Sequence, residues 1–106
     1  MADPPESLRI VDNPELRRYE AYLDDELAGF SDYRLAPGRV VFTHTEVDPR
    51  YGGRGIGSHL VRAELDESRR RGLKVTPVCP FVRAFMRRHA DYHDLLNAPL
   101  REPAAP

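Results

Sequence analysis

The sequence predicts an α/β fold: a twisted mixed sheet with antiparallel early strands, a splayed parallel pair of strands, and flanking helices. Strand-like alternation of apolar and polar residues fills the first half of the chain, up to residue 47. A helical spacing follows, and another strand pattern comes after it. Such a strand-helix-strand crossover makes two strands of the sheet parallel and is nearly always right-handed. The length of 106 residues allows one modest hydrophobic core, so we expect a single domain.

Three strands are expected in the first third of the chain. An apolar run over residues 8–11 ends at the turn sequence Asp12-Asn13-Pro14. Residues 17–23 alternate, and the extended pattern resumes over residues 26–35 after the turn at Asp24-Asp25. The last two runs therefore predict a β-hairpin.

The rest of the chain changes from strand to helix twice. Residues 40–47 are rich in β-branched side chains, which favours a strand. Apolar residues at helical spacings predict an amphipathic helix over residues 55–71, which Gly72 ends. Residues 73–78 return to a strand pattern, and residues 80–89 have the spacing of a second helix.

Both ends of the chain are predicted to be flexible. Residues 1–6 and 97–106 are rich in proline, alanine and charge, so we place the domain at residues 7–96. No apolar stretch has the length of a membrane span or of a secretory signal core. The single cysteine, Cys79, fits a reducing compartment. We therefore expect a cytoplasmic protein with no membrane partner.

Closely spaced glycines mark the start of the first predicted helix. Because Gly53, Gly55 and Gly57 lack a Cβ, successive backbone N–H groups can turn toward one point, where the helix dipole adds partial positive charge. A diphosphate is a natural occupant of such a site. Neither the P-loop pattern nor Gly-x-Gly-x-x-Gly can be fitted, so ATP and dinucleotides are not the predicted ligands.

Three motifs in order resemble the superfamily of GCN5-related N-acetyltransferases (GNAT). Its coenzyme A loop carries Gln/Arg-x-x-Gly-x-Gly/Ala after a strand that ends in Val-x-Pro, and here Val47-Asp48-Pro49 precedes the glycines 52–57. The segments Phe-Thr-His-Thr-Glu-Val at 42–47 and Pro-Val-Cys-Pro-Phe-Val at 77–82 are similar to those of a small single-domain GNAT-like family. The resemblance covers roughly residues 11–95. It implies a minimal GNAT-like fold and acetyl-coenzyme A as cofactor.

The resemblance also implies which residues bind this cofactor. The free edge of the strand at Thr45 to Val47 would hydrogen-bond the pantetheine arm, and Arg54 would add a contact to a phosphate. Gly52 stands where many members have Gln or Arg, which removes one side chain from the site. The diphosphate would be held by the backbone amides of Gly53, Arg54, Gly55, Ile56, Gly57 and Ser58.

Cys79, His44 and Glu46 are the candidate catalytic residues. Pro80 suits the first position of a helix, which makes Cys79 the predicted N-cap, where the helix dipole favours a thiolate. Alternation predicts that Phe42, His44 and Glu46 share one face of their strand, and His44 or Glu46 would be the general base for an amine. Each candidate also has a structural interpretation, since buried thiols pack as small apolar groups and strand histidines often only fill space.

A proton donor is harder to assign. Many members of the superfamily use a tyrosine near the second helix to protonate the coenzyme A thiolate, but Phe85 has no hydroxyl. Tyr92 is the remaining candidate, and the simpler interpretation is that His89 and Tyr92 pack the end of the chain.

The preferred function is acetyl-coenzyme A-dependent N-acetylation of an amine, a small molecule or a protein that the sequence does not identify. Transfer would be direct or would pass through an acetylated Cys79. One alternative is a non-enzymatic coenzyme A-binding module, a sensor or partner protein. Another is a nucleic-acid binder using Arg69 to Arg71 and Arg87 to Arg88, which the net charge of -1 disfavours. We predict no metal site and no nucleic-acid partner, and either a monomer or a weak homodimer.

Overall fold

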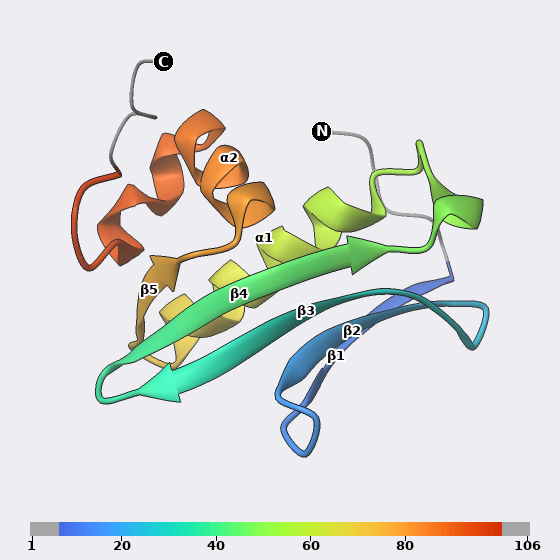
Figure 1. Cartoon of the computed structure of the whole chain (residues 1–106), viewed down its shortest axis with the longest axis horizontal. Helices are drawn as coiled ribbons and strands as arrows, with labels where there is room; N and C mark the ends of the chain where they lie inside the picture. Colours follow the sequence, from blue (N-terminus) through green and yellow to red (C-terminus); the bar gives the residue numbers. More distant parts are fainter. Residues whose placement is uncertain (1–6, 101–106) are drawn as a thin grey trace.

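Five strands lie side by side in the sheet in the same order as in the sequence (Figure 1). The computed structural model describes residues 7–100, so the flexible N-terminus expected at residues 1–6 lies outside the described part, as do residues 101–106 of the flexible tail expected at residues 97–106. The first four strands are antiparallel neighbours, and the fifth pairs in parallel with the fourth. The predicted mixed sheet is therefore confirmed. Its strands are β1 (Leu8–Asn13), β2 (Arg18–Leu23), β3 (Glu26–Ala36), β4 (Arg39–Val47) and β5 (Lys74–Pro77).

Two-residue turns set the register of the hairpins. Asp24 and Asp25 have φ angles of 50° and 69°, the left-handed conformation that a tight turn between twisted strands requires. Aspartate tolerates this conformation better than most residues because its short side chain can bond locally. Pro37 and Gly38 form the two-residue turn between β3 and β4, in which Gly38 has a φ of 72° and Pro37 has a negative φ.

An irregularity in β4 decides which of its side chains share a face. Asp32 pairs with His44 but Tyr33 pairs with Phe42, so Thr43 is an extra residue in the strand, as in a β-bulge. Phe42 is consequently buried in the core, whereas His44 and Glu46 are exposed on the opposite, open face of the sheet. The prediction that Phe42 shares a face with these two residues is wrong, because strict alternation fails across a bulge.

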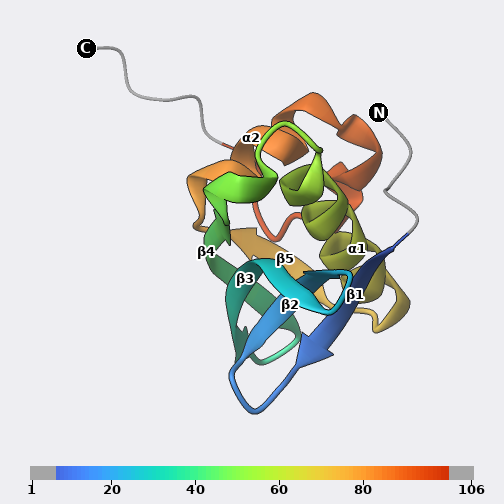
Figure 2. The same ribbon diagram turned by 90° about the vertical axis from the view of Figure 1, so that its right-hand side faces the viewer.

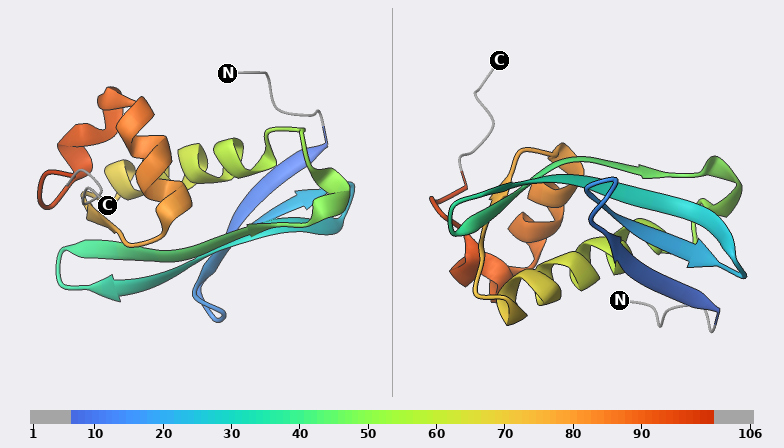
Figure 3. Two further views of the ribbon diagram at one scale, coloured as in Figure 1. Left: turned by 45° about the horizontal axis from the view of Figure 1, so that its top comes forward. Right: turned by 90° about the horizontal axis from the view of Figure 1, so that it is seen from below.

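Both long helices cover the same face of the sheet (Figure 2 and Figure 3). They are α1 (Ile56–Arg70) and α2 (Pro80–Arg88), close to the predicted ranges. Gly72, with φ 71°, ends α1 as expected, and the amide of Leu73 donates to the Ser68 carbonyl at 2.9 Å in a Schellman motif. One core joins sheet and helices, with side chains such as Phe42, Leu60, Leu65, Val82 and Phe85.

Two short 3₁₀ helices were not predicted: η1 (Pro49–Tyr51) and η2 (Ala90–Leu95). The Asp48 carboxylate caps η1 by accepting from the Arg50 amide at 2.9 Å. After η2, the Asn97 amide donates to the Val75 carbonyl at 3.4 Å, and Leu100 packs against the core. Contacts with the domain thus continue beyond Leu96, where the sequence predicts that a flexible tail begins.

Candidate functional site

β4 and β5 separate after a short stretch of pairing. The pairing runs from Arg39 with Lys74 to Phe42 with Pro77. Beyond it, the amides of Val78 and Cys79 both donate to the Phe42 carbonyl, at 3.0 and 2.8 Å. In the described part of the chain, the remainder of β4 has no strand beside it on this edge. We call this place the fork; it is formed by residues 43–47 of β4 and by Val78 and Cys79.

The edge of β4 in the fork presents unpaired backbone groups. The Asp48 amide points to β3, because it donates to the Ala28 carbonyl at 2.8 Å. Backbone groups of successive strand residues point alternately to the two sides, so those of Thr45 and Val47 point away from β3 and into the fork. These are the residues expected to bind a pantetheine arm, and that role stays a prediction.

The loop before α1 presents a run of unbonded amides. Gly53 and Gly55 have φ angles of 79° and 73°, which only glycine adopts without strain. The flanking amides of Gly52 and His59 donate to the carbonyls of Pro49 and Gly55, both at 3.1 Å. Between them, none of the six N–H groups from Gly53 to Ser58 donates to an acceptor within residues 7–100. The loop therefore fits an anionic ligand such as a diphosphate.

Gly57 brings the two helix N-termini together. A Cβ added at Gly57 would lie 2.7 Å from Cζ at the tip of the Phe81 ring, in the first turn of α2, so a larger residue at this position would require the exposed Phe81 ring to move. The positive ends of both helix dipoles consequently lie beside the fork, where they favour negative charge on a ligand or on a side chain.

Arg54 keeps a positive charge next to the loop. Its guanidinium lies 5.7 Å from the centroid of the Tyr51 ring, and the Tyr51 hydroxyl donates to the Glu26 carboxylate of β3. Tyr51 thus ties η1 to the sheet and gives Arg54 a surface to stack on.

Cys79 lies at the base of the fork and is the N-cap of α2, as predicted. Its free thiol is 2% exposed, and Sγ donates to Oγ1 of Thr45 at 3.4 Å. Oγ1 of Thr45 is in turn 3.2 Å from Oγ of Ser31 on β3. The thiol therefore begins a chain of hydroxyl groups that leads into the core.

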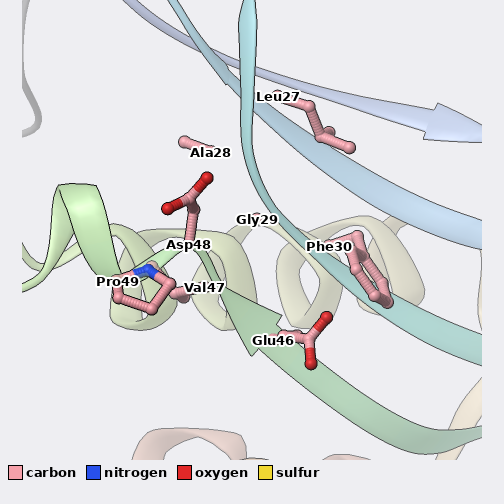
Figure 4. Close-up of a pocket in the computed structure, with 8 residues that line it drawn as sticks. All are labelled: Leu27, Ala28, Gly29, Phe30, Glu46, Val47, Asp48 and Pro49. Atoms are coloured by element: carbon pink, nitrogen blue, oxygen red, sulfur yellow. The ribbon is translucent and has the colours of Figure 1, made fainter.

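His44 and Glu46 lie on the other side of the sheet. Nε2 of His44 is 3.8 Å from Oε1 of Glu46, and the His44 ring faces Phe30 with 6.1 Å between centroids. Glu46 and Phe30 line a hollow of about 470 Å³ along the end of β4 (Figure 4). The structure thus groups His44 with Glu46 but places Cys79 on the opposite face of β4.

Two buried polar residues of α1 escaped the sequence analysis. The Glu64 side chain is fully buried, and neither carboxyl oxygen has a hydrogen-bond partner among the described residues. His59 lies beneath the loop, with Nε2 3.8 Å from where a Cβ of Gly55 would stand and equally without a partner in residues 7–100. The spacing of four between Leu60, Glu64 and Ser68 was the available signal, because it puts Glu64 on the buried stripe of α1.

Tyr92 has a structural role. Its hydroxyl donates to Oδ1 of Asp66 at 2.6 Å and accepts from Nη1 of Arg62 at 3.1 Å. Burial, aided by the bond to Asp66, raises the pKa of Tyr92 to about 12. The His89 ring stacks on Phe85 at 4.0 Å. Both residues therefore pack the end of the chain, which is the simpler of the two interpretations.

The basic run on α1 is paired with acids. Arg69 bonds to Asp94 and Arg70 to Glu67, each at 2.5 Å, and Arg71 lies 3.8 Å from Asp12. This pairing weakens the field that a nucleic-acid phosphate backbone would require. No group of three or more potential metal ligands occurs among the described residues. None of the described helices is long and apolar enough to cross a membrane.

The fold thus combines a five-stranded mixed sheet, a parallel pair that splits at the fork, and a glycine loop at the start of α1. The family model described as GCN5-related N-acetyl-transferase matches residues 18–95, so the chain belongs to that family. No curated protein sequence matches the chain.

Solved structures show the same fold. A GCN5-like protein from Staphylococcus aureus is 20% identical with a TM-score of 0.69, and the match covers 91% of this chain and 94% of that one. A ribosomal-protein-alanine N-acetyltransferase from Brucella melitensis biovar Abortus 2308 is 21% identical with a TM-score of 0.56, covering 83% and 65%. Ard1 from Thermoplasma volcanium is 22% identical with a TM-score of 0.53, covering 62% and 45%, so the chain spans less than half of Ard1.

Proposed function

We propose that this chain is an N-acetyltransferase that uses acetyl-coenzyme A and acts on an amine, a small molecule or a protein. The observation that carries the proposal is the run of six amides at the start of α1, beside the fork, which have no acceptor among the described residues. These amides would hold the diphosphate, and the edge groups of Thr45 and Val47 would bond the pantetheine arm. When bound, acetyl-coenzyme A supplies an activated acetyl thioester, which would lie close to Cys79.

His44 and Glu46 suit the handling of an amine on the open face. Their exposure lets an acceptor approach β4 from the side opposite the helices, near the hollow lined by Glu46 and Phe30. Either His44 or Glu46 would take the proton that the attacking amine must lose. A β4 amide in the fork would donate to the thioester carbonyl as negative charge develops there.

Cys79 has two possible parts in this reaction. In direct transfer, the Cys79 thiol would stay unacylated and would give a proton to the departing coenzyme A thiolate. In covalent transfer, Sγ would attack the thioester carbonyl and release the coenzyme A thiol, and the amine would then displace Sγ from the acetyl group, which restores the Cys79 thiol. A reducing, cytoplasmic setting, in which the free thiol persists, belongs to the proposal.

A thermal-shift comparison tests the ligand class. Acetyl-coenzyme A and coenzyme A are expected to raise the Tm, by a margin that grows with ligand concentration, whereas ATP and NAD leave it unchanged. Equal stabilisation by ATP would contradict the proposal, because it would show a general phosphate site.

Turnover separates an enzyme from a coenzyme A-binding module. Release of coenzyme A from acetyl-coenzyme A with a panel of amines should exceed the amine-free rate. Tight binding without amine-dependent release would favour a sensor or partner protein. Intact-protein mass spectrometry without acceptor decides between the two versions of transfer, since only the covalent version gives an acetyl adduct that Cys79→Ala loses.

A further inference from the structure

α1 carries a buried acid that the proposed reaction does not use. Glu64 is 0% exposed, and neither of its carboxyl oxygens has a hydrogen-bond partner among the described residues. An unpaired carboxylate in a protein interior is costly, so such a group either stays neutral or exchanges a proton with a neighbour. The surroundings of Glu64 offer one such neighbour.

Two hydroxyl groups lead from Cys79 toward Glu64. Sγ of Cys79 donates to Oγ1 of Thr45 at 3.4 Å, and Oγ1 of Thr45 is 3.2 Å from Oγ of Ser31. The Ser31 hydroxyl on β3 is also fully buried, and it lowers the pKa of the Glu64 carboxyl. The chain thus crosses from the N-terminus of α2 through β4 and β3 toward α1.

Electrostatics links the two ends of this chain. Burial raises the pKa of Glu64 well above its ordinary value of 4.5, the Ser31 hydroxyl opposes the rise, and the Cys79 thiol adds to it. The Cys79 thiol is the titratable side chain among these influences. A thiolate and a carboxylate in one buried region repel each other, so the first ionisation of the pair opposes the second.

We propose that Glu64 is a positioning residue that shares one proton with the Cys79 thiol through Thr45 and Ser31. The S–H proton passes to Oγ1 of Thr45, the Thr45 hydroxyl proton passes to Oγ of Ser31, and the Ser31 proton passes to a Glu64 carboxyl oxygen. A thiol and a carboxylate become a thiolate and a neutral acid, with no change in net charge. The reverse sequence restores the thiol.

The consequence concerns the chemistry of Cys79. The thiol and the carboxyl group compete for one negative charge in the core, so Glu64 lowers the share of Cys79 that is thiolate at a given pH. The role in acetyl transfer rests on the proposed function, but the shared proton does not. It is measured on the thiol itself, without coenzyme A.

Alkylation of Cys79 by iodoacetamide, followed by mass spectrometry from about pH 5 to about pH 10, tests the proposal. In the wild type the rate should rise in two steps, one for each ionisation of the pair. Glu64→Gln should give one step and, near neutral pH, a rate several-fold higher, because no carboxylate competes for the charge. Glu67→Gln, at a half-buried position on the same helix that pairs with Arg70, should keep both steps. One identical step in the wild type and Glu64→Gln would overturn the proposal.

A second measurement tests the proposal without the Glu64→Gln variant, which is useful if that variant does not fold. Carboxyl ¹³C NMR follows the titration of Glu64 in the wild type and in Cys79→Ala. The midpoint should fall in Cys79→Ala, because the thiol that opposes ionisation of Glu64 is gone. An unchanged midpoint would show that the two groups titrate independently. Neither result depends on whether the chain binds acetyl-coenzyme A.

Discussion

Gly55 holds the loop in the conformation that exposes its amides. Its φ of 73° is left-handed, and a Cβ there would meet the His59 ring only at ordinary contact distance, 3.7 Å. Gly55→Ala should therefore cost about 1–2 kcal/mol through backbone strain rather than through a clash. Because relaxation would turn the amides away, the affinity for coenzyme A, measured by calorimetry, should fall about tenfold.

Gly38 provides the matched control. It has the same sign of φ, 72°, a Cβ added there would meet nothing within 4 Å, and it turns the β3–β4 hairpin. Gly38→Ala should lose a similar amount of stability and keep the wild-type affinity for coenzyme A. Equal loss of affinity in both variants would mean that the loop conformation does not control binding.

Glu64 makes stability depend on pH in a defined direction. Its pKa in the folded protein is raised by burial, so its contribution to stability is fully present below pH 4.5, the ordinary value. As the pH rises above that value, the unfolded chain loses the proton first, and the folded protein loses stability. Glu64→Gln cannot ionise, so the wild type should lose stability relative to this variant as the pH rises above 4.5, measured by urea unfolding.

Glu67→Gln is the comparison for that measurement. The Arg70 guanidinium lowers the pKa of Glu67, so this group favours folding once ionised, and its effect is lost as the pH falls. As the pH rises, Glu64→Gln should therefore gain stability relative to the wild type, whereas Glu67→Gln should lose stability relative to the wild type. If Glu64→Gln follows the wild type at every pH, Glu64 does not carry a raised pKa.

At the scale of elements, Tyr92 fastens η2 to α1. Tyr92→Phe removes the donor to Asp66 and the acceptor for Arg62 in a buried place, which should cost about 1–2 kcal/mol. The Tm should fall by several degrees, while coenzyme A release stays within about twofold of the wild type. Tyr51→Phe, whose hydroxyl bonds to Glu26 at the surface, should change the Tm little.

Turnover distinguishes the structural role of Tyr92 from a catalytic one. A large fall in coenzyme A release with an unchanged Tm in Tyr92→Phe would make Tyr92 the proton donor. It would contradict the assignment drawn from its two hydrogen bonds.

The strands and long helices could be predicted because their signals are local. Period-two alternation, the turn residues and the pair Cys79-Pro80 each act over a few positions. The bulge at Thr43 could not be predicted, because Phe42, His44 and Glu46 alternate perfectly in the sequence while the extra residue is defined by the partner strand. The 3₁₀ helices η1 and η2 have too few residues to show a period.

At the scale of the whole molecule, the parts of the site with a local sequence signal could be predicted, and the parts assembled from distant residues could not. The loop was recognised because its glycines are adjacent in sequence. The buried chain from Cys79 to Glu64 joins α2, β4, β3 and α1, so only the folded core brings its members together. The open sheet face, with His44 and Glu46, follows from both helices packing on the other side.

The central claim is that the amides from Gly53 to Ser58 bind the diphosphate of coenzyme A. Titration of ¹⁵N-labelled protein with coenzyme A, followed by ¹H–¹⁵N correlation spectra, reads these amides one by one. The largest shifts should fall on Gly53 to Ser58, with further shifts at Thr45 and Val47. Saturable binding that leaves the amides of Gly53 to Ser58 unshifted would contradict the claim.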